Sequence, residues 1–269
     1  MRSNLPTFLI VGVMKGSTSA AALNLNKHKS VYCVTGYWKR KVNAFHSIDT
    51  TQLEGGLGEE SSKELDFYNI DKNYEKGLDF YTKYFPIGKQ YRGESSPNYF
   101  HDNPLVGTKR MYECFPNLKI IVLLRDPITR AFSHWNMIQK QNPSWGTRFY
   151  GLDFENSTKN SPTLNTLLKR SLYSDTLKNY INTFGKSNVY VGLQEQIANN
   201  PLEEYNKIFT FLGADNLEKD PGFKKSFVST YSDSINDNTV AWLKEYFKSD
   251  VDNLKELYPN LDYSIWNTY

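Results

Sequence analysis

Residues 12–19 combine the backbone freedom and the side chains of an anion-binding loop. Gly12 and Gly16 allow the chain to curl, and Lys15 between them supplies a mobile positive charge. Three hydroxyl side chains follow the lysine: Ser17, Thr18 and Ser19. Where a helix starts at such a loop, its first N–H groups converge and bind a phosphate or sulfate group. We therefore predict an anion site here, although glycines at a strand-to-helix turn also occur where the two elements simply pack closely.

The order of residues in this loop differs from that of a Walker A loop. A Walker A loop ends in Gly-Lys followed by Ser or Thr, whereas Lys15 here precedes Gly16. The sequence also has no evident acidic strand end suited to magnesium. A phosphate-loop kinase or NTPase therefore stays open only as an alternative class, and magnesium-independent activity would argue against it.

A second group of anion-binding side chains follows the apolar run 118–124. Arg125 comes directly after the run, and Ser133 lies eight residues later, within the first two turns of an expected helix. A guanidinium fork and a nearby hydroxyl are suited to a second phosphate group. The alternative is that Arg125 only pairs with the neighbouring Asp126.

The elements that would position these residues alternate between strands and helices. Apolar, partly β-branched runs predict strands at Phe8–Val13, Val31–Val34, Leu118–Leu124 and Val189–Leu193, and we expect a further short strand at Tyr91–Glu94. Amphipathic segments predict helices from about Ala20 and at Pro104–Phe115, Ile128–Lys140, Ser171–Phe184, Pro201–Leu212 and Asn238–Tyr258. The fifth of these would end at Gly213, and the last would break near Ser249. Residues 142–164 and 214–237 are expected to be loops, and residues 35–65 a mobile insertion or a lid.

This alternation predicts an α/β fold in which helices cover both faces of a mostly parallel sheet. We expect a single domain over residues 1–269. In open α/β sheets, ligands bind beyond the carboxyl ends of the strands. The loops that follow Val13 and Leu124 should therefore lie at the same edge of the sheet.

Composition excludes several classes of protein. A net charge of +3, from 32 Lys and Arg against 29 Asp and Glu, does not indicate a nucleic-acid-binding protein. The two cysteines, Cys33 and Cys114, fit neither a metal cluster nor a disulfide framework. The apolar runs are too short for a transmembrane segment, and the amino terminus has no signal-peptide pattern. We therefore expect a cytoplasmic location.

Together the two anion-binding segments resemble those of sulfotransferases that use 3′-phosphoadenosine 5′-phosphosulfate (PAPS), above all the heparan sulfate and related carbohydrate branch. Residues 11–18, Val-Gly-Val-Met-Lys-Gly-Ser-Thr, resemble the 5′-phosphosulfate loop, with Ser17 where many members have glycine. Residues 124–133, Leu-Arg-Asp-Pro-Ile-Thr-Arg-Ala-Phe-Ser, resemble the 3′-phosphate segment. Further similarity lies in residues 63–68, 93–100, 171–173 and 254–266. The resemblance implies a three-layer fold like that of P-loop NTPases.

The resemblance also implies roles for individual residues. Lys15 would stabilise the leaving oxygen, and four loop residues would hold the 5′-phosphate: Gly16, Ser17, Thr18 and Ser19. Arg125 and Ser133 would hold the 3′-phosphate, with Tyr173 as a further donor-binding residue. Lys224 and Lys225 are candidates for the late basic loop of the family, the alternative being a solvated pair of charges.

For the base, the resemblance points to Glu64, whose pKa we expect to be raised by burial beside Phe67 and Tyr68. Glu94 is a second candidate, either as the base or as an orienting neighbour. Three histidines are lesser options: His46, His101 and His134. No metal is required for this transfer.

The acceptor is less well defined. The resemblance favours a sugar hydroxyl or amine, whereas the acidic, glycine-rich residues 54–64 and several aromatic side chains would equally suit a small polar or cationic metabolite. A binding module without catalytic activity is a third class, but it would lack Lys15 or the base. We expect no nucleic-acid partner, and the sequence does not indicate an oligomeric state.

Overall fold

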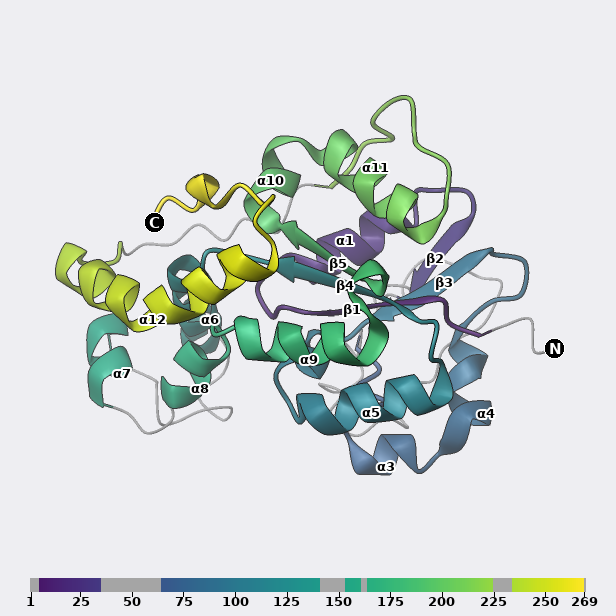
Figure 1. The fold of residues 1–269 in the computed structure, drawn as a ribbon, viewed down its shortest axis with the longest axis horizontal. Helices are drawn as coiled ribbons and strands as arrows, with labels where there is room; N and C mark the ends of the chain where they lie inside the picture. Colours follow the sequence, from purple (N-terminus) through teal and green to yellow (C-terminus); the bar gives the residue numbers. More distant parts are fainter. Residues whose placement is uncertain (1–4, 35–63, 141–152, 161–163, 225–233, 269) are drawn as a thin grey trace.

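The protein has a central sheet of five strands, in the order β2-β3-β1-β4-β5 (Figure 1). The computed structural model describes residues 5–34, 64–140, 153–160, 164–224 and 234–268. The strands are β1 (Phe8–Gly12), β2 (Val31–Val34), β3 (Tyr91–Ser95), β4 (Lys119–Leu124) and β5 (Val189–Leu193). All four pairings between neighbouring strands are parallel. All five strands that we predicted are therefore present, with ends that differ by one residue at most.

Helices cover both faces of the sheet, as a continuous apolar strand such as β1 requires. Leu9 and Val11 pack into the hydrophobic cluster on one face, whereas Phe8 and Ile10 pack into the cluster on the other. The second face is covered by α1 (Thr18–Leu25), α10 (Gln194–Asn199) and α11 (Pro201–Leu212). The first is covered by α5 (Pro104–Cys114), α6 (Pro127–Lys140), α9 (Ser174–Phe184) and α12 (Asp237–Leu257). The three-layer α/β architecture is confirmed.

Short helices complete the described residues. They are α3 (Asp71–Tyr74), α4 (Gly77–Tyr81), α7 (Phe154–Asn160) and α8 (Leu164–Lys169), with single 3-10 turns at Thr82–Tyr84, Pro97–Phe100, Lys186–Asn188 and Tyr263–Ile265. Of the predicted insertion or lid at 35–65, residues 35–63 lie outside the described part of the chain. Among the described helices, none is long and apolar enough to cross a membrane.

Three predictions about elements were wrong. The predicted loop at 142–164 contains α7, because Phe154 packs on Phe132 with 5.1 Å between ring centroids and Ser157 accepts a hydrogen bond from the Trp135 indole. The last helix does not break near Ser249. The helix predicted from Ser171 begins at Ser174.

The Asp250 carboxylate explains both the start of α9 at Ser174 and the continuous course of α12. Asp250 accepts hydrogen bonds from the Tyr173 and Ser174 amides, at 2.8 and 2.9 Å. Asp250 thus lies within α12 and binds the amides at the start of α9. The predicted end at Gly213 is confirmed, because Gly213 has φ 93° and follows the last residue of α11.

Candidate active site

The two predicted anion-binding loops meet at the carboxyl edge of the sheet. Strands β1 and β4 are parallel neighbours, and the Val13 amide donates to the Leu123 carbonyl across 3.0 Å. The Arg125 guanidinium donates to the Lys15 carbonyl, with 3.3 Å between Nη1 and O. Lys15 and Arg125 therefore lie next to each other at the same edge of the sheet.

The loop after β1 is a tight turn in which a lysine occupies a glycine-like conformation. The Gly16 amide donates to the Val13 carbonyl at 2.8 Å, and Lys15, in the third position of this turn, has φ 71°. A type II turn requires a positive φ there. Gly16 itself has no room for a side chain, because a Cβ atom would lie 2.3 Å from the Leu123 carbonyl oxygen. The sequence thus specifies a turn packed directly against β4.

Helix α1 starts at this turn, so its first N–H groups lie at the edge of the sheet. Ser17 precedes the helix with φ 67° and makes no side-chain capping hydrogen bond. Thr18 is buried, and Ser19 is half-buried. The helix start and the hydroxyl residues are therefore placed as the anion-loop hypothesis predicts, and their contact with a ligand stays a prediction.

Four of the described residues other than glycine have a positive φ. They are Lys15, Ser17, Asp66 and Asn103. A non-glycine residue in this conformation costs roughly 1–3 kcal/mol and is often found at functional sites. Lys15 and Ser17 belong to the loop after β1. Asp66 accepts a hydrogen bond from Asn98, and Asn103 follows Asp102, which pairs with Arg170.

Arg125 makes no ion pair with Asp126, so that alternative is wrong. The Asp126 carboxylate instead accepts hydrogen bonds from the Ile128 and Thr129 amides, at 2.9 and 3.2 Å, and caps α6. The Arg125 side chain contacts Thr129 Oγ1 at 3.3 Å and the Lys15 carbonyl. Among the described residues, Arg125 forms no ion pair, although its charge acts on the Glu195 carboxyl group.

Two other residues of the predicted donor site are buried. Ser133 lies in the second turn of α6 and is 3% exposed. Tyr173 is fully buried, and its hydroxyl donates to the Arg125 carbonyl at 2.9 Å. Tyr173 therefore acts on the site by holding the backbone of Arg125.

Sequence reasoning did not assign a role to Arg130 or Arg170. Arg130 is fully buried on α6 and lies 3.5 Å from the Met14 carbonyl. Arg170 lies 3.6 Å from Met14 Sδ and forms an ion pair with Asp102 at 2.6 Å. Arg130 lies within the segment 124–133, but the orientation of its side chain toward the loop after β1 depends on tertiary structure.

A pair of carboxylates adjoins these cations. The Asn98 side-chain amide donates to Asp66 Oδ2 at 3.1 Å and lies 3.4 Å from Glu64 Oε2. The Asn98 side-chain oxygen, Oδ1, lies 3.4 Å from the Arg170 guanidinium, which contacts Met14. This chain of contacts links Glu64 to the anion loop.

The burial of the acidic residues differs from our expectation. Glu64 is half-buried, whereas Phe67 and Tyr68 pack into the core against Tyr81, with ring centroids at 4.3 and 5.2 Å. Asp66 is the buried member of the pair, and burial raises its pKa to about 6 despite the hydrogen bond from Asn98. Its Oδ1 atom has no hydrogen-bond partner among the described residues.

Glu94 is enclosed by protein and supports the segment that carries Glu64. It is fully buried, and burial raises its pKa to about 7. It accepts hydrogen bonds from Ser96 and Tyr99, both at 2.6 Å, and from Tyr81 at 3.0 Å. The Ser96 hydroxyl in turn accepts the amides of residues 65 and 66, and the Tyr99 hydroxyl accepts the amide of residue 67. This geometry fits the orienting role that we considered for Glu94.

The remaining candidates are placed as follows. Burial, followed by the charge of Arg130, lowers the pKa values of His101 and His134. Lys224 is exposed, and the Asn24 side chain binds both its amide and its carbonyl, at 2.8 and 2.9 Å. His46 and Lys225 lie outside the described residues.

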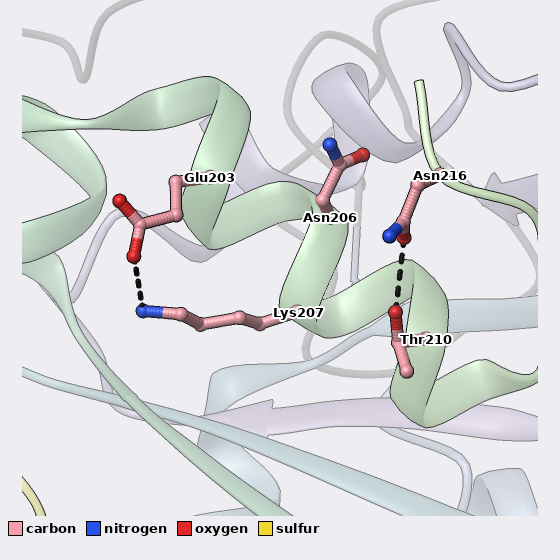
Figure 2. Close-up of a pocket in the computed structure, with 5 residues that line it drawn as sticks. All are labelled: Glu203, Asn206, Lys207, Thr210 and Asn216. Carbon is pink, nitrogen blue, oxygen red and sulfur yellow. Dashed lines mark hydrogen bonds and ion pairs between the residues drawn. The ribbon is translucent and has the colours of Figure 1, made fainter. Parts of the chain in front are cut away.

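A polar hollow on the outer surface of α11 is separate from this edge of the sheet. Figure 2 shows its lining residues: Glu203, Asn206, Lys207, Thr210 and Asn216. Glu203 and Lys207 pair at 2.8 Å, and Thr210 donates to Asn216 at 2.9 Å. None of these residues belongs to the segments that resemble a donor site.

Comparison with known proteins points to one family. The model of the sulfotransferase family matches residues 6–219. Among curated relatives, heparan sulfate glucosamine 3-O-sulfotransferase 5 of Homo sapiens is 25% identical over 213 residues, which cover 77% of this chain and 53% of the relative. Bifunctional heparan sulfate N-deacetylase/N-sulfotransferase 3 of Mus musculus is 26% identical over 218 residues, covering 78% of this chain and 22% of the relative. The chain thus matches about half the length of the first of these relatives, and less of the second.

Solved structures support the fold. A sulfotransferase from Alicyclobacillus acidocaldarius aligns with a TM-score of 0.68 at 24% identity, over 98% of this chain and 99% of that one. The sulfotransferase domain of the Synechococcus PCC 7002 olefin synthase aligns with a TM-score of 0.53 at 14% identity, over 97% and 98% of the two chains. The three-layer architecture is therefore one that sulfotransferases adopt.

Proposed function

The chain belongs to the sulfotransferase family, and on that premise we propose that it transfers a sulfuryl group from PAPS to an acceptor hydroxyl or amine. The observation that carries the proposal is the position of Arg125. Its guanidinium lies 3.3 Å from the Lys15 carbonyl and forms no ion pair with a described residue, although its charge acts on the nearby Glu195 carboxyl group. A partly buried cation that no ion pair occupies is suited to an anionic ligand. Two cationic side chains at one edge match a donor with phosphate groups at both ends.

The donor supplies an activated sulfuryl group, and the residues of this chain bind and orient it. The first amides of α1 and the hydroxyl groups of residues 17–19 would hold the 5′-phosphate. Arg125 would hold the 3′-phosphate through its guanidinium fork, with Ser133 as a second hydrogen-bond donor. This division explains why a nucleotide without a 3′-phosphate, such as ADP, should bind more weakly.

The transfer itself needs a base on one side of the sulfur atom and a cation on the other. A bond forms between the acceptor oxygen or nitrogen and sulfur as the bond from sulfur to the bridging phosphate oxygen breaks. Glu64 would take the acceptor proton, and Lys15 would stabilise the charge that develops on the leaving phosphate oxygen. The contacts through Asn98, Arg170 and Met14 support this placement of Glu64 beside the loop.

A carbohydrate is the acceptor class that we propose first, because the curated relatives above are named for heparan sulfate. A small polar or cationic metabolite is the second, and it is favoured by the carboxylates Glu64 and Asp66 near the loop. An anionic polymer would be repelled by these carboxylates unless they were paired. An acceptor screen with neutral sugars, amino sugars and small amines would separate the two classes.

Calorimetry with adenosine 3′,5′-bisphosphate beside ADP tests the donor. We expect the bisphosphate to bind at least tenfold more tightly, which corresponds to one charged phosphate contact. Transfer of label from ³⁵S-labelled PAPS in the presence of EDTA then tests the reaction. Equal binding of ADP, or activity only with ATP and magnesium, would overturn the proposal in favour of a kinase or NTPase.

A further inference from the structure

Arg130 is a fully buried arginine whose contacts are all with neutral groups. Its Nε donates to Ser171 Oγ at 2.5 Å, one Nη donates to the Leu167 carbonyl, and the other lies 3.5 Å from the Met14 carbonyl. In the part of the chain that the structure describes, no carboxylate pairs with it. Burial and the charges of Arg170 and Arg125 lower its pKa only to about 10, so it is a cation at neutral pH.

A buried guanidinium without a counter-ion is costly unless its donors are satisfied. Arg130 meets this condition by joining two segments that are distant in the sequence: residues 167–171, which include the end of α8 and the turn after it, and the loop after β1. A long apolar side chain would fill the same space without the cost of burying a charge. The charge therefore suggests a role beyond packing.

The position of the Met14 carbonyl suggests what this role is. In a trans peptide, the carbonyl and the following N–H point in opposite directions. Because the Met14 carbonyl faces Arg130, the Lys15 N–H is turned to the other side of the turn. Arg125 covers the next carbonyl, that of Lys15. Two guanidinium groups thus cover two successive carbonyl oxygens, which would otherwise repel an anion bound at the loop.

We propose that Arg130 is a positioning residue that fixes the turn at residues 13–16 in the orientation that receives the 5′-phosphate of the donor. The identity of the anion rests on the proposed function, whereas the fixing of the turn does not. Arg130 does not touch the donor in this proposal. It acts through Met14, and it shields the bound anion from the Met14 carbonyl dipole.

The test compares four variants with the wild-type protein. Arg130→Met removes the charge and the fork, Arg130→Lys keeps the charge alone, and Ser171→Ala removes one anchor of the guanidinium. Arg110→Met is the matched control, because Arg110 packs on Tyr74 and pairs with Asp71, away from the loop. Each variant is titrated calorimetrically with adenosine 3′,5′-bisphosphate, adenosine 5′-monophosphate and adenosine 3′-monophosphate.

We expect Arg130→Met to bind the bisphosphate and the 5′-monophosphate at least about tenfold more weakly than the wild type does. Its affinity for the 3′-monophosphate should equal that of the wild type. Arg130→Lys should recover part of this loss. A loss shared equally by the 5′- and 3′-monophosphates would indicate general damage and would overturn the proposal, as would unchanged binding. If Arg130→Met does not fold, Arg130→Lys and Ser171→Ala carry the same comparison with smaller expected losses.

Hydrogen exchange separates this inference from the proposed function. Without any nucleotide, the amides of residues 14–17 should exchange several-fold faster in Arg130→Met than in the wild type or in Arg110→Met. If the wild type fails to bind the bisphosphate, the proposed function fails, and exchange alone then decides whether Arg130 fixes the turn. Unchanged exchange at these amides would overturn the inference even in a protein that binds PAPS.

Discussion

The Arg125 guanidinium donates a hydrogen bond to the Lys15 carbonyl, although 110 positions separate the two residues in the chain. This contact joins the loops that follow two neighbouring strands, β1 and β4. It brings the side chains proposed for the two ends of the donor to one edge of the sheet. It also allows the two ends to be tested separately, since each loop contributes a cation of a different kind.

Replacing Lys15 by alanine should lower the rate of transfer by about 100-fold or more, because the developing charge on the leaving oxygen loses its cation. The fold should persist, since Lys15 is a half-buried residue of a turn. The measurement is kcat with labelled PAPS beside circular dichroism, with Lys207→Ala on α11 as the control. Near-full transfer by the Lys15 variant would remove this lysine from the mechanism.

Arg125→Met should weaken binding of adenosine 3′,5′-bisphosphate by about 10- to 100-fold. Adenosine 3′-monophosphate should lose the most affinity and the 5′-monophosphate less, because Arg125 also covers the Lys15 carbonyl. This order is the reverse of the one expected for Arg130→Met. Calorimetry with the three nucleotides measures it, and Arg110→Met again serves as the control. Weaker binding of the bisphosphate and the 5′-monophosphate with unchanged binding of the 3′-monophosphate would mean that Arg125 holds the loop and not the 3′-phosphate.

The two carboxylates that share the Asn98 amide should behave differently on substitution. Glu64→Gln should lower kcat by about 100-fold or more if Glu64 is the base. Asp66→Asn should leave most of the activity but change its pH profile near pH 6, where the buried carboxyl titrates. The measurement is kcat from pH 5 to 9. If Asp66→Asn is the inactive variant and Glu64→Gln is not, the base is Asp66.

The sequence predicted β1 and β4 well because each is a continuous apolar run, which ends at Gly12 in β1 and before Arg125 in β4. The first loop could be assigned from Lys15 and Gly16, since these residue types are unusual at the end of a buried strand. Helix α7 could not be predicted, because its sequence is mostly polar and its stability comes from Phe154 packing on Phe132, 22 positions earlier.

Residues that act through tertiary contacts escaped the sequence analysis for the same physical reason. The direction of Arg130 toward the Met14 carbonyl depends on how α6 packs on the sheet. The difference between a half-buried Glu64 and a fully buried Glu94 depends on three hydroxyl groups from separate positions. Residue type made both Glu64 and Glu94 candidates for the base. Their different burial favours Glu64 as the base and Glu94 as an orienting residue.

Thr268 should stabilise the turn that carries Arg125. Its hydroxyl and its amide both donate to Asp126 Oδ2, at 2.5 and 3.2 Å. Thr268→Val keeps the shape and removes the hydroxyl, so we expect a loss of about 1 kcal/mol in the free energy of unfolding. Urea denaturation measures it. Ser264→Ala, which removes an exposed hydrogen bond to Asp262, should change little. Equal stability of Thr268→Val and the wild type would show that the amide contact suffices.

Glu94 should make the stability of the protein depend on pH near neutrality. Burial raises its pKa from 4.5 to about 7 in the folded state, in spite of the three hydroxyl groups that donate to it. Between these two values the folded protein holds a proton on Glu94 that the unfolded chain releases. The free energy of unfolding therefore falls as the pH rises through this window, by up to about 1.4 kcal/mol per pH unit.

Glu94→Gln removes this titration, because glutamine resembles the protonated acid at every pH. We expect the advantage of the wild type over Glu94→Gln to be largest near pH 4.5 to 5 and to shrink steadily toward pH 7. Urea denaturation of both proteins at half-unit pH steps measures the difference. Asp66, whose raised pKa acts in the same direction, remains in both proteins and cancels in the comparison. A difference that stays constant across the window would mean that Glu94 is ionised throughout and that its hydroxyl donors outweigh its burial.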